Sequence, residues 1–155
     1  MPPRTIILQV NDIDLEVFAD TEDLGVFIDS KLNFAKNIDS IISKANQRTY
    51  LIFKSFNTRA VKPLSLAFKT YILPLLDYCS SVWNPFLLKD IDRLEKVQKR
   101  FTKRLTGLRD MPYSQRLTAC GLVSLELRRL RILTLYSVLK LLNHWLISSL
   151  TIFCI

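Results

Sequence analysis

The stretch from Leu88 to Leu105 has a two-faced pattern that restricts its structure more than any other part of the chain. Apolar residues recur in it at spacings of three and four, which is the repeat of one face of an α-helix. These residues are Ile91, Leu94, Val97, Phe101 and Leu105. The spacing therefore predicts a helix over residues 88–105 with a buried apolar stripe.

A second face of this predicted helix carries only positive charges, on Lys96, Lys99, Arg100, Lys103 and Arg104. The acids Asp90, Asp92 and Glu95 stand early in the helix and the cations late, an order that the helix dipole alone favours. The dipole does not account for five cations on a face without an acid, since a solvated helix gains stability from pairs of opposite charge. Contacts with phosphate groups would account for that face.

Charge is divided unevenly along the chain of 155 residues. Residues 1–30 contain one base and seven acids, a net charge of −6, so residues 31–155 carry +14 and the total is +8. A basic body indicates a polyanionic partner, although basic surfaces also serve solubility. With 49% hydrophobic residues, the chain is long enough to form one globular domain with a core.

The remaining pattern predicts a mainly α fold with a small antiparallel β element of two to three strands. Two β-branched runs on either side of Asn11 and Asp12 are typical of a hairpin. Residues 24–28 are expected to add a strand, with a bulge or a close backbone approach at Gly25. We divide the chain into a β element at 1–30, a helical domain at 31–144 and an apolar tail at 145–155.

Capping residues and a proline divide the helical domain. The first helix is expected to begin near Ser30 or Asn33 and to end near Ser55, with Leu51 in its buried stripe. Pro74 is expected to end or bend a second helix, because proline lacks an N–H donor and clashes with the preceding turn. That bend is expected to aim the aromatic rings of Tyr78 and Trp83 into the core.

Glycines mark the ends of the later helices. Gly107 is expected to follow the basic helix, and Gly121 to end a short helix near residues 114–119. Ser124 is expected to begin the last long helix. The buried face of that helix is predicted to consist of Leu125, Ile132, Leu133, Tyr136 and Leu139.

Three segments follow one another in a characteristic order over residues 24–143. They read DLGVFIDSKLNFAKNIDSIISKANQR, then LDYCSSVWNP with DIDRLEKVQKRFTKRLTGL, then RDMPYSQRLTACGLVSLELRRLRILTLYSVLKLLN. In this order they resemble the part of a jockey-type non-LTR retrotransposon reverse transcriptase that follows the polymerase palm. The resemblance implies a fragment with the end of the palm, the thumb and the helices after it.

The resemblance implies that this fragment holds a template–primer duplex, either RNA or RNA–DNA, by its backbone. No group of residues in the sequence is typical of base recognition, so binding is expected to tolerate any sequence. The alternative is a helical interaction remnant that self-associates or docks on a palm-containing partner through the apolar surface that the missing sheet leaves. The candidate phosphate contacts are Lys96, Lys99, Arg100, Lys103, Arg104, Arg128 and Arg129.

The sequence predicts no catalytic residue, metal ligand or cofactor. Polymerases hold two metal ions with carboxylates, and the resemblance implies that these lie in palm motifs upstream of this segment. Residues 18–20 read Phe-Ala-Asp, but Thr21 stands where a second aspartate would follow, and we interpret the match as chance. Asp77 is interpreted as a helix-end or surface residue. The chain is therefore not expected to be an enzyme by itself.

Cysteine usage and the chain ends indicate an intracellular protein, in the cytoplasm or the nucleus. Cys79, Cys120 and Cys154 are far apart and form neither a zinc motif nor a disulfide framework. The first ten residues lack the pattern of a secretory signal. The apolar tail is shorter than the ~20 residues that a membrane span needs, so we do not expect a membrane anchor.

We predict that the purified protein shows no template-directed DNA synthesis with magnesium or manganese, because the carboxylates that would hold the two ions are missing. The measurement is nucleotide incorporation on a primed RNA template, beside a mock preparation. Incorporation above that of the mock preparation would contradict the prediction.

Overall fold

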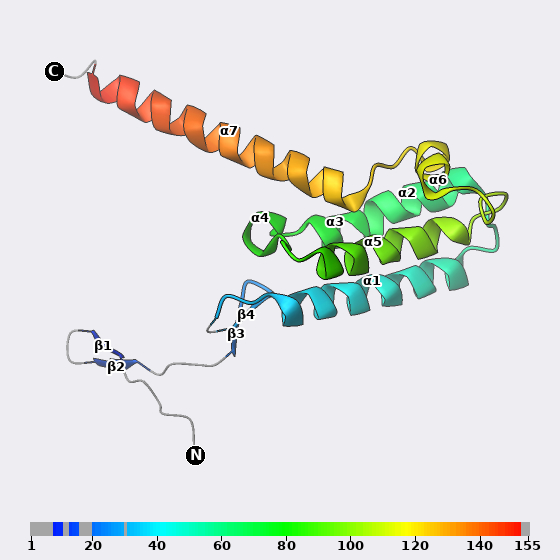
Figure 1. Ribbon diagram of the computed structural model, residues 1–155, viewed down its shortest axis with the longest axis horizontal. Coiled ribbons are helices and arrows are strands. Elements are labelled where there is room, and N and C mark those ends of the chain that lie inside the picture. The colour runs from blue at the N-terminus through cyan, green and yellow to red at the C-terminus, as the bar shows by residue number, and fades with distance from the viewer. Residues whose placement is uncertain (1–7, 11–12, 16–19, 30, 153–155) are drawn as a thin grey trace.

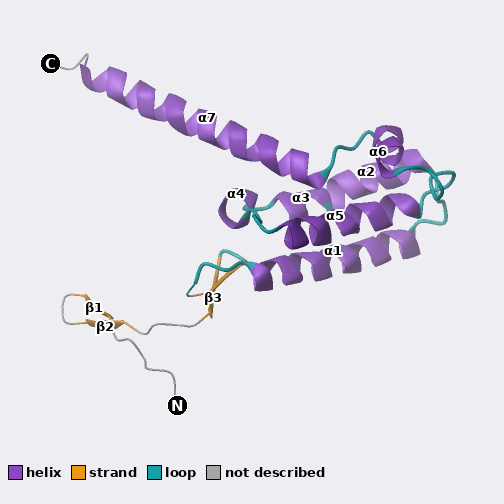
Figure 2. Cartoon of the chain, in the orientation of Figure 1, coloured by secondary structure: helices purple, strands orange, loops and turns teal. Residues whose placement is uncertain are grey.

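The computed structural model describes the backbone of residues 8–10, 13–15, 20–29 and 31–152, and the side chains of residues 21–29 and 31–142. Helices dominate it and two small antiparallel hairpins precede them (Figures 1 and 2), which confirms the predicted mainly α fold with an N-terminal β element. The helices are α1 (Ala35–Ser55), α2 (Val61–Tyr71), α3 (Leu73–Asp77), α4 (Ser80–Trp83), α5 (Leu88–Lys103), α6 (Tyr113–Cys120) and α7 (Leu125–Ile152).

Four short strands form two separate hairpins. In the first, which the sequence predicts, β1 (Leu8–Val10) pairs with β2 (Ile13–Leu15). In the second, β3 (Asp20–Asp23) pairs with β4 (Val26–Asp29). Strand β3 is not predicted from the sequence, because acidic residues are depleted in strands and give no β signal.

The turn of the second hairpin corrects the role expected of Gly25. Residues 24–28 do not form one strand, because Leu24 and Gly25 connect β3 to β4. Both residues have positive φ, 46° and 81°. That combination is the one that a two-residue type I′ hairpin turn requires. Gly25 therefore makes a tight turn rather than a bulge.

The second hairpin packs against the start of α1. Val26 is buried, and the backbone N–H of Phe27 donates to Oδ1 of the buried Asn37 at 3.3 Å. The N-cap of α1 is Phe34, not the predicted Asn33, which stands one residue earlier and accepts with its Oδ1 from the backbone N–H of Ala35 at 3.2 Å. The alternative cap, Ser30, lies outside the described residues.

The core lies where α5 packs against α1 and α2. The ring of Phe101 has its centroid 5.0 Å from that of Phe53 on α1 and 4.6 Å from that of Phe68 on α2. Trp83 is fully buried, and its indole N–H donates to the Tyr78 carbonyl at 2.7 Å. Within the predicted stripe of α5, Ile91 is partly buried. The other residues of the stripe are buried, namely Leu94, Val97, Phe101 and Leu105.

Pro74 separates α2 from α3, as the sequence predicts. α2 ends at Tyr71, and Pro74 stands in the first turn of α3, where a missing N–H costs nothing. The bend turns Trp83 into the core, but the prediction for Tyr78 is wrong. Its side chain is 53% exposed. Its hydroxyl donates to the Leu24 carbonyl at 2.9 Å, so it ties the second hairpin to the body instead.

Gly107, Gly121 and Ser124 lie near the helix ends where the sequence predicts them. Gly107 has a φ of 77° beyond α5, and Gly121 ends α6 with a φ of 59°. Ser124 precedes α7, and its hydroxyl accepts from the backbone N–H of Leu127 at 3.3 Å. The basic helix is shorter than predicted, because α5 ends at Lys103. Leu105 is nevertheless buried in the segment that follows.

α7 leaves the helical body and projects away from it (Figure 1). Leu125 is buried as predicted, but Tyr136 and Leu139 are exposed, and so is Leu51 on α1. The periodicity of one helix cannot show whether a neighbour covers its apolar face. The helix does not end where the apolar tail was predicted to begin, at residue 145, because α7 continues to Ile152.

We predict that Leu64→Ala lowers the free energy of unfolding by about 2–5 kcal/mol, because it opens a cavity in the core. Leu64 is fully buried in α2, whereas Leu66 on the same helix is 65% exposed. The matched change Leu66→Ala should therefore alter that free energy by less than about 0.5 kcal/mol. Urea unfolding followed by circular dichroism measures both. Equal losses in the two variants would contradict this packing.

Candidate nucleic-acid interface

A hollow of about 1250 Å³ opens between the C-terminal halves of α1 and α5. Two loops close one end of it, and the backbone N–H of Thr106 in one donates to the Arg59 carbonyl of the other at 3.0 Å. Every charged residue that lines the hollow is basic and exposed. These residues are Lys54, Arg59, Arg100, Lys103, Arg104 and Arg109. We call the hollow with these six side chains the basic cleft.

An aromatic ring, rather than a carboxylate, holds two of these cations. The guanidinium carbon of Arg59 lies 4.6 Å from the centroid of the Phe53 ring, and that of Arg104 lies 5.2 Å from it. Cation–π contacts position a charge without neutralising it. Among the described residues none of the six cations forms an ion pair. The basic cleft therefore presents a concentrated and uncompensated positive potential.

The basic cleft contains three of the seven predicted contacts and three cations that were not predicted from the sequence. Arg100, Lys103 and Arg104 were predicted from the α5 pattern, whereas Lys54 lies in the last turn of α1 and Arg59 and Arg109 lie in loops. No periodic pattern connects residues on different elements. A surplus of bases over acids in residues 54–62 and 99–109 was the available signal.

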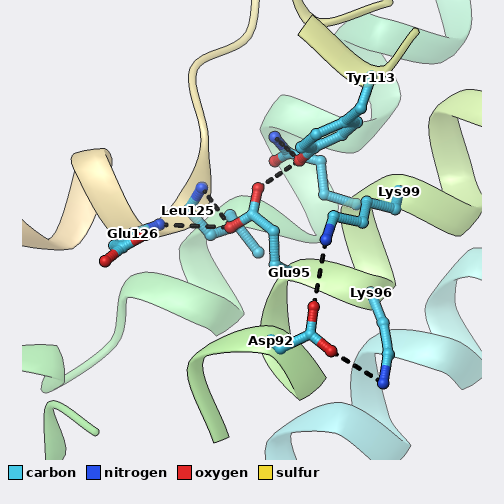
Figure 3. A network of polar contacts seen from close by, with 8 residues as sticks. Asp92, Glu95, Lys96, Lys99, Tyr113, Leu125 and Glu126 are labelled. Atoms are coloured by element: carbon cyan, nitrogen blue, oxygen red, sulfur yellow. Dashed lines mark hydrogen bonds and ion pairs between the residues drawn. The ribbon is translucent and has the colours of Figure 1, made fainter. Parts of the chain in front are cut away.

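Lys96 and Lys99 belong to a different part of α5, and the prediction that their face lacks an acid is wrong. Both ammonium groups pair with Asp92, at 2.9 Å from Lys96 and 3.1 Å from Lys99 (Figure 3). Hydrogen bonds from Lys96 and then Lys99 lower the pKa of Asp92. Lys99 also lies over the ring of Tyr113, 5.6 Å from its centroid. Asp92 thus already compensates part of the charge of these two lysines.

Arg128 and Arg129 contribute to the attachment of α7 to the body. Burial of Arg129 speaks against the predicted phosphate contact there, whereas Arg128, whose side chain is 41% exposed, stays a predicted contact. The Arg128 Nε donates to Oδ2 of Asp77 on α3 at 2.6 Å. The side chain of Arg129 is buried with 2% exposure. Burial lowers the pKa of Arg129, and the negative charges of Glu95, Glu126 and Asp77 oppose that shift. Neither side chain lines the basic cleft. Asp77 is the last residue of α3, in agreement with its interpretation as a helix-end residue.

Glu95 of α5 caps the first turn of α7. One carboxylate oxygen of the buried Glu95 accepts from the backbone N–H groups of Leu125 at 2.9 Å and Glu126 at 3.4 Å (Figure 3). The other oxygen accepts from the hydroxyl of Tyr113. Burial, and then this hydrogen bond, raises the pKa of Tyr113. A carboxylate at a helix N-terminus interacts favourably with the helix dipole. Glu95 thereby offsets the unfavourable interaction of that dipole with the positive charges of Arg128 and Arg129 near the start of α7.

The described residues contain no cluster of three or more histidine, cysteine or acidic side chains that would hold a metal ion. Cys79, before α4, and Cys120, at the end of α6, are free thiols. No helix within the described residues is both long enough and apolar enough to cross a lipid bilayer. Of the Phe-Ala-Asp triplet, only Asp20 lies in a described position, in strand β3.

The chain is similar to a protein of Caenorhabditis elegans named Uncharacterized protein B0403.1. The two are 29% identical over 140 residues, a match that covers 88% of this chain and 65% of the worm protein. The chain therefore spans less than two thirds of the length of this relative. No known family model and no solved structure matches the chain.

We predict that Glu95→Ala lowers the free energy of unfolding by about 2–4 kcal/mol, because it removes several hydrogen bonds to a charged group and one of the three negative charges that act on the buried Arg129. Glu126→Ala is the matched control. The Glu126 side chain is exposed in the same first turn of α7, so its removal should cost under about 1 kcal/mol. Chemical denaturation measures both losses, and similar values would contradict the capping role.

Proposed function

We propose that this chain binds the phosphate backbone of an RNA or RNA–DNA duplex in the basic cleft. The observation that carries the proposal is the set of six exposed cations that line one hollow without an acid among them. Like charges so close together repel one another, and a polyanion removes that repulsion while releasing its condensed counterions. The cation–π contacts of Arg59 and Arg104 keep two of these charges in place.

The proposal includes the origin of the chain as a fragment of a non-LTR retrotransposon reverse transcriptase that acts inside the cell. Its support is the order of the segments over residues 24–143, described above. By itself the fragment would hold a template–primer duplex without extending it. Lysine and arginine contacts to phosphates position a duplex but read no bases, so binding would be sequence-tolerant.

A second candidate function is supported by the surface of α7. Beyond its first turns the helix exposes Leu135, Tyr136, Leu139, Leu141 and Leu142, which are between 51% and 69% exposed. A helix with apolar residues on all sides is normally covered by other protein. Self-association or docking on a palm-containing partner would cover it. Association that depends on protein concentration and persists at high salt favours this alternative.

We predict that Arg100→Gln with Lys103→Gln flattens the plot of log affinity against log salt by about 2, since each lost phosphate contact changes the slope by about 0.9 on a B-form duplex. The matched control is Lys96→Gln with Lys99→Gln, which removes the same charge from the same helix. Those two lysines pair with Asp92 outside the basic cleft, so their loss should leave the slope nearly unchanged.

Fluorescence anisotropy of a labelled RNA–DNA duplex, titrated with protein at several salt concentrations, gives the slopes. Circular dichroism establishes that each double variant is folded. If both double variants flatten the slope equally, the effect arises from net charge and the basic cleft is not the interface. If neither changes the slope of folded protein, phosphate binding on α5 is excluded.

A further inference from the structure

Tyr50 is an exposed aromatic side chain inside the basic cleft. It projects from α1 one turn before Lys54, and both residues line the hollow. The Tyr50 side chain is 61% exposed, and it makes no hydrogen bond to any described residue. The other aromatic residue of the cleft, Phe53, is buried, and its ring already contacts Phe101 and two guanidinium groups. Tyr50 is thus the aromatic ring of the cleft that a ligand can reach.

We propose that Tyr50 forms a stacking site for an unpaired base, so that the basic cleft takes a duplex with a single-stranded extension. This inference rests on the proposed function, because the cations are needed to bring the strand to the ring. An aromatic face beside a row of cations is the combination with which proteins bind single-stranded nucleic acid, since every base has a stacking surface. The bases within a duplex are stacked on one another and offer no such surface.

The size and the polar lining of the basic cleft fit this ligand. Its volume of about 1250 Å³ exceeds the ~300–1,000 Å³ of common small-molecule sites, so it has room for a nucleotide beside the backbone contacts. Asn46 lies one turn before Tyr50 on α1 and also lines the cleft. Its amide both donates and accepts hydrogen bonds, which suits the edge of a base without selecting one.

The test compares the affinity for a blunt RNA duplex with that for the same duplex carrying a short single-stranded extension. We expect the wild-type protein to bind the extended duplex more tightly, on the order of tenfold, as one stacked base contributes. Tyr50→Ala should abolish this preference and leave the salt slope on the blunt duplex unchanged. Tyr50→Phe should retain the preference, because the ring does the stacking.

Tyr71→Ala is the matched control, since Tyr71 is 58% exposed and lies outside the basic cleft. It should leave the preference intact. A 2-aminopurine in the extension provides a second readout, because stacking on Tyr50 should quench its fluorescence in the wild type and the Tyr50→Phe variant, but not in Tyr50→Ala.

The outcomes separate this inference from the proposed function. If folded Tyr50→Ala keeps both the preference and the quenching, the stacking site is refuted while duplex binding stands. The same holds if the wild type binds both duplexes equally well with a steep salt dependence. If no salt-dependent binding occurs on either duplex, the proposed function fails and the stacking site fails with it.

Discussion

The packing of Phe101 between Phe53 and Phe68 determines how α5 lies against α1 and α2. Because α5 is fixed there, its last turn faces the end of α1, and the basic cleft lies between them. The same Phe53 ring that meets Phe101 inside the core meets Arg59 and Arg104 at the surface. One side chain therefore connects the stability of the fold to the placement of the charges.

α5 divides its charges between two tasks. In its first half, carboxylates dominate and are used structurally, since Glu95 caps α7 and Asp92 pairs with two lysines. In its last turns, Arg100 and Lys103 have no acidic partner among the described residues. The gradient that the helix dipole favours thus also separates a structural half from a half that is open to an anionic ligand.

Much of the fold could be predicted from the sequence, because its signals are local. The stripe on α5, the break at Pro74 and the helix end at Gly121 each depend on residues within a few positions of one another. The site could be predicted only in part. The Asp92–Lys96 pair has the spacing of helix neighbours and was open to prediction. The surroundings of Arg129 include Glu95 of α5 and Asp77 of α3, and Arg59 meets the segment after α5 only in the folded chain.

The way α7 is attached has a mechanical consequence. Its 28 residues extend about 42 Å at 1.5 Å per residue, while its contacts with Glu95 and Asp77 all lie within the first two turns. The helix therefore acts as a lever whose pivot is its first two turns, which Glu95 of α5, Asp77 of α3 and packing against α4 hold in place. A tilt of about 10° at that pivot would move the far end of a helix of this length by roughly 7 Å. A small displacement of α5 would therefore produce a larger displacement of the C-terminal end of α7, which lies far from the basic residues of α5.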